Sequence, residues 1–376
     1  MRITVLVLLL GAALAAPTYA PARTMAQPYQ GDRLAYVANG KLYVGFPGRA
    51  RQMRGPGTAT QPAFSHDGQW LAWIRRRPQL MLGFALPHLW LARADGSAAH
   101  MVASIHGVAS FQWSPSADVL AVQPMARYGT PPIELVPAQG VVHPLPHRLQ
   151  GEFLWSPDGR KLAVASMSRT GGAHFYVVSG ATVHSYALPG MAPFSPVRLA
   201  AWWPDGHGIL YWLGPDACES CIADGTKLLD YDLQTGKVHH LGISLPYPDW
   251  IAASDKRLLI VRGSGRSAFF GKHLQLCATD GPCRAVLGGL RDKISLDPAW
   301  SPGGDAMAFV VAPAWNTYGF RPAARYRRWL DAHVLWTARS DGSDARPAGG
   351  GVPSGVRDPL WTRDERGILF VKDGAL

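Results

Sequence analysis

The chain lacks most of the sequence features that identify an enzyme or a membrane protein. It has only four cysteines in 376 residues, and beyond its N-terminal leader no apolar run approaches the roughly 20 residues that a membrane helix needs. The Gly-x-Ser-x-Gly motif of hydrolases and the His-Glu-x-x-His motif of zinc proteases are both missing. These absences disfavour membrane-spanning proteins and the common hydrolases, and they favour a binding role over catalysis.

What the sequence does contain is a short pattern repeated seven times. An anchor residue, usually Trp, is followed seven residues later by an apolar residue that begins a second strand. The seven pairs are Phe64/Leu71, Trp113/Leu120, Trp155/Leu162, Trp202/Ile209, Ala252/Leu259, Trp300/Met307 and Trp361/Ile368. Successive anchors are 42 to 61 residues apart, and a period of this size is typical of propellers and solenoids.

Turn residues separate the strands of each repeat. Ser156-Pro157-Asp158-Gly159 lies between the first two strands of the clearest copy, and Ser340-Asp341-Gly342-Ser343 is one of the Gly turns expected between the last two. Each repeat therefore predicts four antiparallel strands, A to D, which make one propeller blade. We expect the anchor Trp to pack between neighbouring blades, because one blade cannot bury both of its faces alone.

The pattern Trp-Ser-Pro-Asp-Gly-x-x-Leu-Ala, best seen at Trp155–Ala163, resembles the TolB-type, WD-repeat-like β-propeller repeat. The resemblance covers the chain from about Asp32 onward and implies a propeller of six to eight blades that acts as an interaction platform or as an accessory domain. TolB also carries an N-terminal α/β domain, for which this chain has no room. The role of TolB itself is therefore not implied.

The predicted fold is an all-β propeller of four-stranded antiparallel blades, with seven blades favoured and six or eight as alternatives. We expect the ring to close by pairing N- and C-terminal strands, with Lys41–Gly45 as strand C of the last blade. One conflict remains, because Leu34–Val37 and Ile368–Val371 both look like strand B. Either one is displaced, or an eighth blade is partly formed, or the natural protein is longer.

The N-terminus predicts export. Residues 1–26 form a signal peptide, with an apolar run over Ile3–Ala16 and cleavage after Ala20 or Ala26; an uncleaved anchor helix is the alternative. Residues 27–376 then form a single propeller domain. The expected location is the periplasm, the cell surface or the extracellular space.

The four cysteines fit an exported protein. Cys277 and Cys283 flank a turn at facing ends of an expected hairpin, and Cys218 and Cys221 lie together in a loop, so two local disulfides are predicted. The alternatives are a zinc site built from all four and a redox-active Cys-x-x-Cys.

The net charge of +11 suits contact with anionic polymers or surfaces. Nucleic acid is not expected as a partner, since the protein is exported and shows no nucleic-acid-binding motif. We expect a monomer that binds a protein or an anionic envelope polymer and needs no cofactor.

The long connections of the predicted blades all join strands B and C, so one face should be elaborated, and long loops on a rigid scaffold often carry function. The longest insertion, within residues 312–332, alternates arginines with aromatic residues, a mixture that suits carboxylates, phosphates, sugar faces or protein anchors. The ligand-binding candidates are Trp315, Tyr318, Phe320, Arg321, Arg325, Tyr326, Arg327, Arg328 and Trp329, with Arg75, Arg76 and Arg77 on the same face. The alternative is that the insertion packs its own rings over the blade edge.

A second constellation lies three residues before four of the anchors, where the chain has Glu152, Asp249, Asp297 and Asp358. Strand A is innermost in a propeller, so these carboxylates should form part of a ring at the channel mouth. Such a ring could hold calcium or a cationic group. Alternatively, each carboxylate caps backbone amides at the start of strand A.

We predict an exported β-propeller that binds an anionic cell-envelope component or a partner protein through its B–C loop face. The alternatives are a metal-dependent enzyme with its site in the channel, similar to a lactonase or a sugar dehydrogenase, and the accessory propeller of a larger enzyme.

Overall fold

The protein is described from a computed structural model of the chain. The residues whose placement it describes are 4–9, 29–30, 33–46, 49–76, 86–126, 130–167, 173–188, 197–213, 225–247, 250–254, 257–263, 271–278, 282–288, 292–315, 323–349, 354–362 and 364–372. The chain divides into two compact units, one made of Ala12–Met191 and the other of Met1–Gly11 with Ala192–Leu376. Each unit is described by itself.

The unit Ala12–Met191 contains four sheets, each of four strands. The first two sheets are β2 (Tyr29–Gln30), β3 (Arg33–Ala38), β4 (Lys41–Gly45), β5 (Arg51–Gln52), then β6 (Thr58–Phe64), β7 (Trp70–Arg76), β8 (His88–Arg93), β9 (His100–Met101). The next two are β10 (Val108–Trp113), β11 (Val119–Pro124), β12 (Glu134–Pro137), β13 (His143–Pro144), then β14 (Glu152–Trp155), β15 (Leu162–Met167), β16 (Ala173–Ser179), β17 (Thr182–Ala187). A short 3-10 helix, η1 (Pro146–Arg148), precedes the fourth sheet.

The other unit also contains four sheets. Three have four strands: β18 (Val197–Trp202), β19 (Gly208–Leu213), β20 (Thr226–Asp232), β21 (Val238–Ser244); β22 (Ile251–Ser254), β23 (Arg257–Arg262), β24 (His273–Ala278), β25 (Arg284–Ala285); and β26 (Lys293–Trp300), β27 (Ala306–Pro313), β28 (Val334–Arg339), β29 (Arg346–Pro347). The last sheet has three strands, in the order β1 (Thr4–Leu9), β31 (Gly367–Lys372), β30 (Val356–Trp361). One helix, α1 (Ala323–Asp331), lies between β27 and β28.

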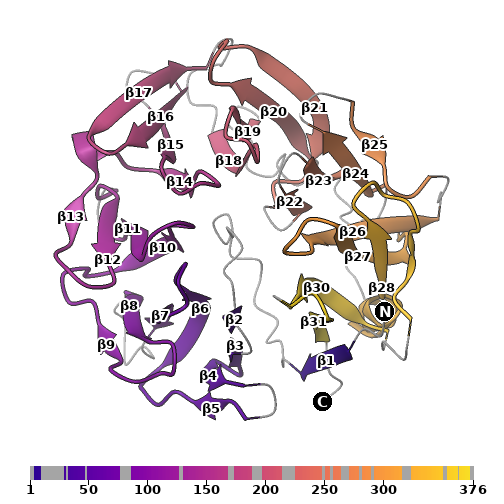
Figure 1. Ribbon diagram of the computed structural model, residues 1–376, viewed down its shortest axis with the longest axis horizontal. Helices are drawn as coiled ribbons and strands as arrows, with labels where there is room; N and C mark the ends of the chain where they lie inside the picture. The colour runs from indigo at the N-terminus through magenta and orange to yellow at the C-terminus, as the bar shows by residue number, and fades with distance from the viewer. Residues whose placement is uncertain are drawn as a thin grey trace. The chain divides into compact units, whose positions relative to one another are not determined.

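In all seven four-stranded sheets the strands are hydrogen-bonded in chain order, and their described pairings are antiparallel. Figure 1 shows that consecutive sheets within a unit lie side by side, each with its first strand on the inner side and its last on the outer side. Four-stranded antiparallel sheets that follow one another in this way are propeller blades. The fold is therefore an all-β propeller, as the repeat predicts.

An N-terminal strand pairs with the C-terminal strand, as expected, but it is not the segment that the sequence analysis assigned. Lys41–Gly45 does not complete the last blade; it forms β4 and pairs with β3 and β5, in a sheet that starts with Tyr29–Gln30. The two candidate strands B therefore belong to different sheets, and eight sheets form. The partner of the C-terminal strand β31 is instead β1, from the leader.

Neighbouring blades are joined by the anchor tryptophans. The indole N–H of Trp113 donates to the carbonyl oxygen of Ala63 in the preceding blade at 2.9 Å, and that of Trp155 donates to Gln112 at 3.2 Å. In the other unit Trp300 donates to Ala252 at 3.2 Å. Each bond links two successive strands A, and apolar side chains fill the space between the sheets. The anchors therefore pack between blades, as expected.

The regular spacing between strands A and B is explained, in three of the turns, by hydrogen bonds within the turn. Ser156 Oγ donates to Asp158 Oδ1 at 2.6 Å and accepts from the amide of Lys161 at 2.9 Å. The same arrangement recurs at Ser65 with Asp67 and at Thr362 with Asp364. Gly159 takes a φ of 67° in this turn, a conformation that glycine adopts without steric cost. The Ser-x-Asp-Gly sequence therefore fixes the direction of strand B.

Candidate functional site

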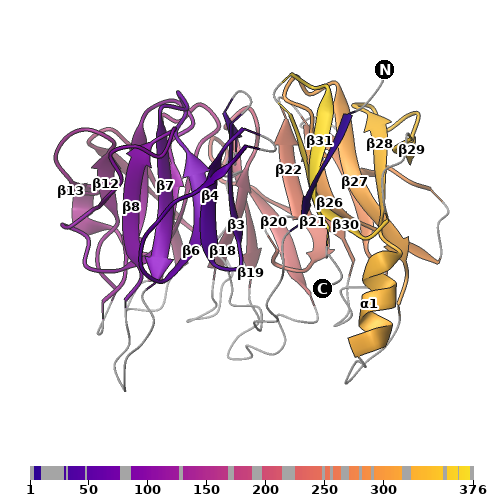
Figure 2. The same cartoon turned by 90° about the horizontal axis from the view of Figure 1, so that it is seen from below.

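The insertion between β27 and β28 forms a helix where the sequence analysis expected a loop. Helix α1 covers Ala323–Asp331 and lies at the end of these strands (Figure 2). Tyr326, Trp329, Leu330 and His333 recur at the spacing of one helix face. This pattern is the signal that predicts the helix, and the alternation of arginines with rings obscured it.

The aromatic residues of the insertion pack against one another and against the blade. Trp315, Tyr326 and Trp329 have ring centroids 5.9 to 6.2 Å apart. Trp329 also donates its indole N–H to the carbonyl oxygen of Pro313 at 2.8 Å. Trp315 and Trp329 are each only 7% exposed and belong to the core shared by two blades. The three rings therefore hold α1 in place, and Trp315 and Trp329 are largely enclosed in doing so.

The arginines of α1 lie outside the packed face of the helix. Arg325, Arg327 and Arg328 are exposed, and within the described part of the chain none of them forms an ion pair with an acidic side chain. The guanidinium of Arg325 lies 5.6 Å from the ring centroid of Trp315. The result is a basic surface on a helix that is anchored by buried rings. Tyr318, Phe320 and Arg321 lie outside the described residues.

Behind α1 lies a buried histidine that the sequence analysis did not single out. The ring of His333 meets Trp329 edge-on, with centroids 4.3 Å apart and planes at 86°. Burial, together with the positive charge of Arg357, lowers the pKa of His333 to about 4, although the backbone of Val356 acts in the opposite direction. His333 is therefore neutral at pH 7 and serves as an apolar contact for the helix.

The three consecutive arginines at the end of β7 do not act as one group. Arg75 is buried, donates to the carbonyl oxygen of Pro56 at 3.2 Å and lies 5.5 Å from the ring centroid of Trp90. Burial lowers the pKa of its guanidinium. Arg76 is exposed, and Arg77 lies outside the described residues. Arg75 therefore fastens the connection before β6 to the blade, and only Arg76 is shown to be open to a partner.

The predicted acidic ring has a backbone feature that the sequence does not reveal. Asp297 and Asp358 have positive φ angles of 50° and 48°, and Gln61 has 53° at the equivalent position of another blade. Each is followed by Pro and lies at a bulge in strand A. Asp297 Oδ2 accepts a hydrogen bond from the amide of Asp358 at 3.4 Å, which links two successive blades. For Asp297, this contact resembles the alternative expected from the sequence, in which each carboxylate accepts a hydrogen bond from a backbone amide.

Two members of the predicted ring remain, Glu152 and Asp249. Glu152 is the first residue of β14 and is half-buried, and Asp249 lies outside the described residues. Among the side chains that the structure describes, no group of three or more His, Cys, Asp and Glu lies close enough to hold a metal ion.

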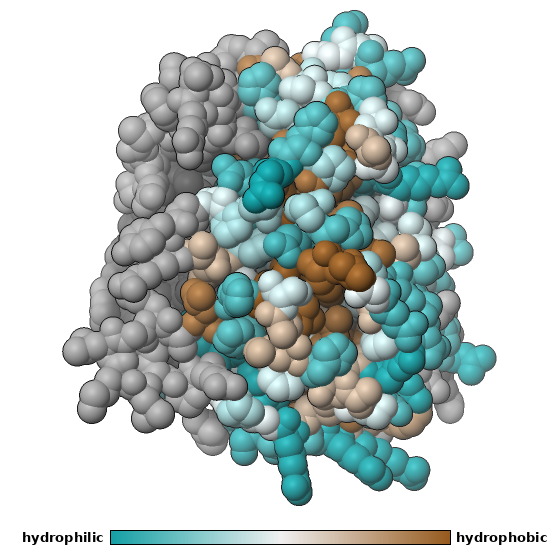
Figure 3. Space-filling view, turned by 90° about the vertical axis from the view of Figure 1, so that its left-hand side faces the viewer, coloured by the Kyte–Doolittle hydropathy of each residue, from teal (hydrophilic) through white to brown (hydrophobic). Residues whose placement is uncertain are grey.

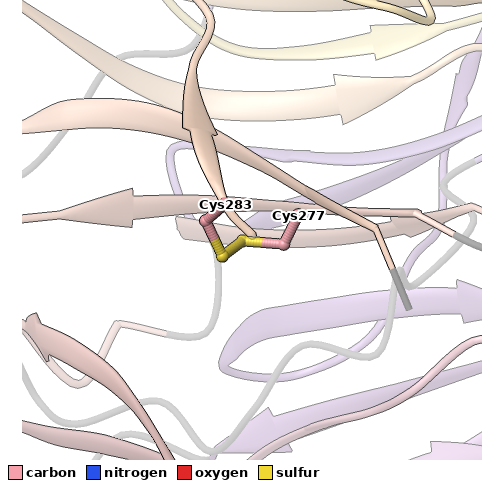
Figure 4. Close-up of a disulfide and its surroundings, with 2 residues drawn as sticks. All are labelled: Cys277 and Cys283. Atoms are coloured by element: carbon pink, nitrogen blue, oxygen red, sulfur yellow. A yellow bond between two sulfur atoms is a disulfide. The ribbon is translucent and has the colours of Figure 1, made fainter. Parts of the chain in front are cut away.

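One predicted disulfide is present. Cys277, at the end of β24, is bonded to Cys283 across the turn before β25, with their Cα atoms 4.0 Å apart (Figure 4). Cys277 is buried in the core between two blades. A zinc site made from all four cysteines is therefore wrong, because two of them are consumed in this bond. Cys218 and Cys221 lie outside the described residues.

The side of the molecule drawn in Figure 3 has a different character from the arginine face of α1. Among the residues drawn in colour, hydrophobic and hydrophilic ones are mixed, with brown areas between teal ones. A folded protein commonly leaves apolar atoms on its surface. This side therefore does not mark a second site. No helix among the described residues has the length and apolar character needed to cross a membrane.

Comparison with known proteins supports the fold and leaves the activity open. No family model matches the sequence, and no curated protein matches it. A structure of a prolyl endopeptidase is similar with a TM-score of 0.53 and 12% identity, over 85% of this chain and 49% of that one. The β-propeller domain of the Trilobed protease from Pyrococcus furiosus has a TM-score of 0.49 and 13% identity, over 86% and 97% of the two chains.

TolB from Acinetobacter baumannii is also similar, with a TM-score of 0.39 and 15% identity, over 88% of this chain and 67% of that one. The chain spans about half the length of the prolyl endopeptidase chain. At these identities the likeness concerns the fold alone, and a propeller fold hosts many unrelated functions.

Proposed function

We propose that the protein is an exported binding propeller that holds an anionic component of the cell envelope on the arginine face of helix α1, made of Arg325, Arg327 and Arg328. The observation that carries the proposal is the contrast between the two sides of this helix. Trp329 is buried in the blade and Tyr326 is half-buried against it, whereas the three arginines are exposed and form no ion pair among the described residues.

The chemistry of this face favours phosphate or carboxylate groups. Guanidinium groups are always charged and present planar arrays of N–H donors that match these anions in two-point contacts. A helix fixed by packed rings holds the three arginines on one short segment before a partner arrives, so less backbone ordering accompanies binding. The net charge of +11 adds long-range attraction for the same class of partner.

The proposal is tested by co-sedimentation of the protein with isolated cell envelopes and with vesicles that contain anionic lipids. The variant Arg325→Ala, Arg327→Ala, Arg328→Ala is compared with wild type at low and high salt. One basic residue near an anionic surface contributes about 1 kcal/mol, so the triple variant should bind on the order of 100-fold more weakly. Binding by wild type should also weaken with salt.

A matched control separates the local face from the total charge. The variant Arg51→Ala, Arg54→Ala, Arg160→Ala removes the same charge from exposed positions in the other unit and should bind almost as tightly as wild type. Equal losses in both variants would mean that net charge alone attracts the envelope. Absence of binding by wild type would overturn the proposal.

A further inference from the structure

The last sheet is built differently from the other seven. In each of those, the second strand pairs antiparallel with the third. In the last sheet β30 and β31 take the first two places, and the third is held by β1, which runs parallel to β31. Six residue pairs are in register, from Thr4 with Gly367 to Leu9 with Lys372. A segment of the leader therefore covers the outer edge of β31.

The strand β31 has the sequence of an interior strand. Its residues Gly367–Lys372 read Gly-Ile-Leu-Phe-Val-Lys, so the edge carries neither Pro nor charge before its final residue. Ile368 and Phe370 are buried in a cluster with residues of the neighbouring blade, including Ala308. Natural edge strands are protected by charges, prolines or bulges. These features are absent between Gly367 and Val371, so β31 requires a strand beside it.

The occupant of this edge is the segment that export removes. Thr4–Leu9 lies within the predicted signal peptide, upstream of both cleavage positions. Cleavage would leave the outward N–H and C=O groups of β31 without β1, and such a row of groups pairs readily with another extended chain. The shape and backbone spacing of the vacated place stay fixed, because Ile368 and Phe370 hold β31 against the neighbouring blade.

We infer that the edge of β31 in the mature protein is a strand-addition site that takes an extended segment of a partner protein. The segment has the chemistry of the one now seated there: about six residues, apolar and uncharged, without Pro, since Thr4–Leu9 reads Thr-Val-Leu-Val-Leu-Leu. Backbone hydrogen bonds supply the affinity, and side chains on alternate positions supply the selectivity. The inference rests on the export part of the proposed function, and it does not involve the arginines of α1.

The test uses the mature protein purified from exporting cells, with a synthetic peptide of the Thr4–Leu9 sequence flanked by lysines as the probe. Amide hydrogen exchange is followed by mass spectrometry over Gly367–Lys372. At a peptide concentration of about ten times Kd, exchange there should slow about tenfold. The same peptide with N-methyl groups on alternate amides keeps its side chains but loses ladder hydrogen bonds, so it should have little effect.

Each other outcome overturns the inference. Unchanged exchange at Gly367–Lys372 with the peptide would show that the edge takes no strand. Slow exchange there before peptide is added would show that another segment of the chain, or a second copy, already covers it. Retention of the leader in the mature protein would show that β1 stays in place. The triple arginine variant should bind the peptide as wild type does, so failure of the arginine face and failure of the β31 edge are distinguishable.

Discussion

At the scale of single residues, the repeated tryptophan links one blade to the next rather than contacting a ligand. Trp113, Trp155 and Trp300 each donate an indole N–H to a carbonyl oxygen on strand A of the preceding blade. A buried Trp N–H needs a partner, and here the same ring supplies both apolar area and one directional bond. This double use explains why Trp recurs at the anchor and why the repeat reveals the fold without revealing a partner.

Replacing Trp113 separates these two contributions. Trp113→Phe keeps an aromatic ring but leaves the carbonyl oxygen of Ala63 without its donor, so we expect a loss of about 1–2 kcal/mol in the free energy of unfolding. Trp113→Ala also removes the buried ring and should cost about 3–5 kcal/mol. Urea unfolding followed by circular dichroism measures both. Equal losses for Phe and Ala would contradict the role given to the ring.

The buried histidine behind α1 predicts a pH dependence of stability. His333 takes up a proton near pH 6.5 in the unfolded chain, whereas its pKa in the folded protein is lowered to about 4 by burial and by Arg357. Between these values the unfolded state binds more protons, so the folded state is fully stabilised above about pH 6.5 and loses stability as the pH falls toward 4. The loss amounts to about 3 kcal/mol.

The measurement is the free energy of unfolding of wild type and of His333→Phe across pH 4 to 7. The variant should show a smaller decline, and the difference between the two curves isolates His333 from other groups that titrate in the same range. His100→Gln, at an exposed position, is the control and should follow wild type. Parallel curves for wild type and His333→Phe would mean that His333 is not buried as a neutral ring.

At the scale of elements, the hairpin of β24 and β25 is closed by the Cys277–Cys283 bond. β25 contributes only Arg284 and Ala285 to this pairing, so we expect the bond to hold the outer strand in place. Removing it with Cys277→Ala and Cys283→Ser should lower the free energy of unfolding by roughly 2 kcal/mol. The reason is that the unfolded chain regains the conformational entropy that closure of this short loop removes.

Reducing agent provides the comparison. Reduced wild type should approach the stability of the double variant, measured by urea unfolding in the presence and absence of reductant. Any response to reductant that the variant retains would belong to Cys218 and Cys221. A variant as stable as oxidised wild type would show that backbone pairing alone holds β25.

The sequence predicted the blades because their signals are local. An anchor, a turn with Gly and an apolar run lie within a dozen residues, and the turn's hydrogen bonds depend on those residues alone. Pairing of the chain's ends is a contact between segments far apart in sequence, and several runs of similar composition compete for it. The sequence pattern therefore places Lys41–Gly45 in the wrong sheet and does not indicate that Thr4–Leu9 is a strand.

The candidate site was predicted less completely than the fold. The sequence located the insertion and its arginines, but not which of its side chains are buried. Trp315 and Trp329 are residue types common in binding surfaces, yet both pack against the blade and are buried there. The positive φ of Asp297 and Asp358 also has no local sequence signal beyond the following Pro, because it arises from a bulge in the pairing with strand B.

At the scale of the whole molecule, the net charge determines which kind of surface the protein attracts. A chain with 37 basic and 26 acidic residues attracts anionic surfaces over about 8 Å at physiological salt. In the proposed function, the net charge would bring such a surface close, and the arginines of α1 would then determine where it binds. Specificity must therefore come from geometry, since charge alone does not distinguish one anionic polymer from another.

The covalent state of the N-terminus decides which surfaces the molecule offers. In the full chain Thr4–Leu9 is a strand of the last sheet, and a segment held in a ladder is not accessible to a peptidase. The signal-peptide prediction therefore requires that the leader be engaged before the last sheet forms. We expect protein recovered from exporting cells to begin at Pro21 or Gln27, and protein made and folded without export to keep residue 1 or 2 as its start.

Intact-mass spectrometry of the two preparations, without reductant, measures this difference directly. The exported form should also carry the mass deficit of the Cys277–Cys283 bond, because disulfides persist in oxidising compartments. An exported protein that retains the leader would contradict the signal-peptide prediction and would make β1 a permanent strand. Cleavage at either site would instead remove β1 and leave the outer edge of β31 open to a strand from a partner.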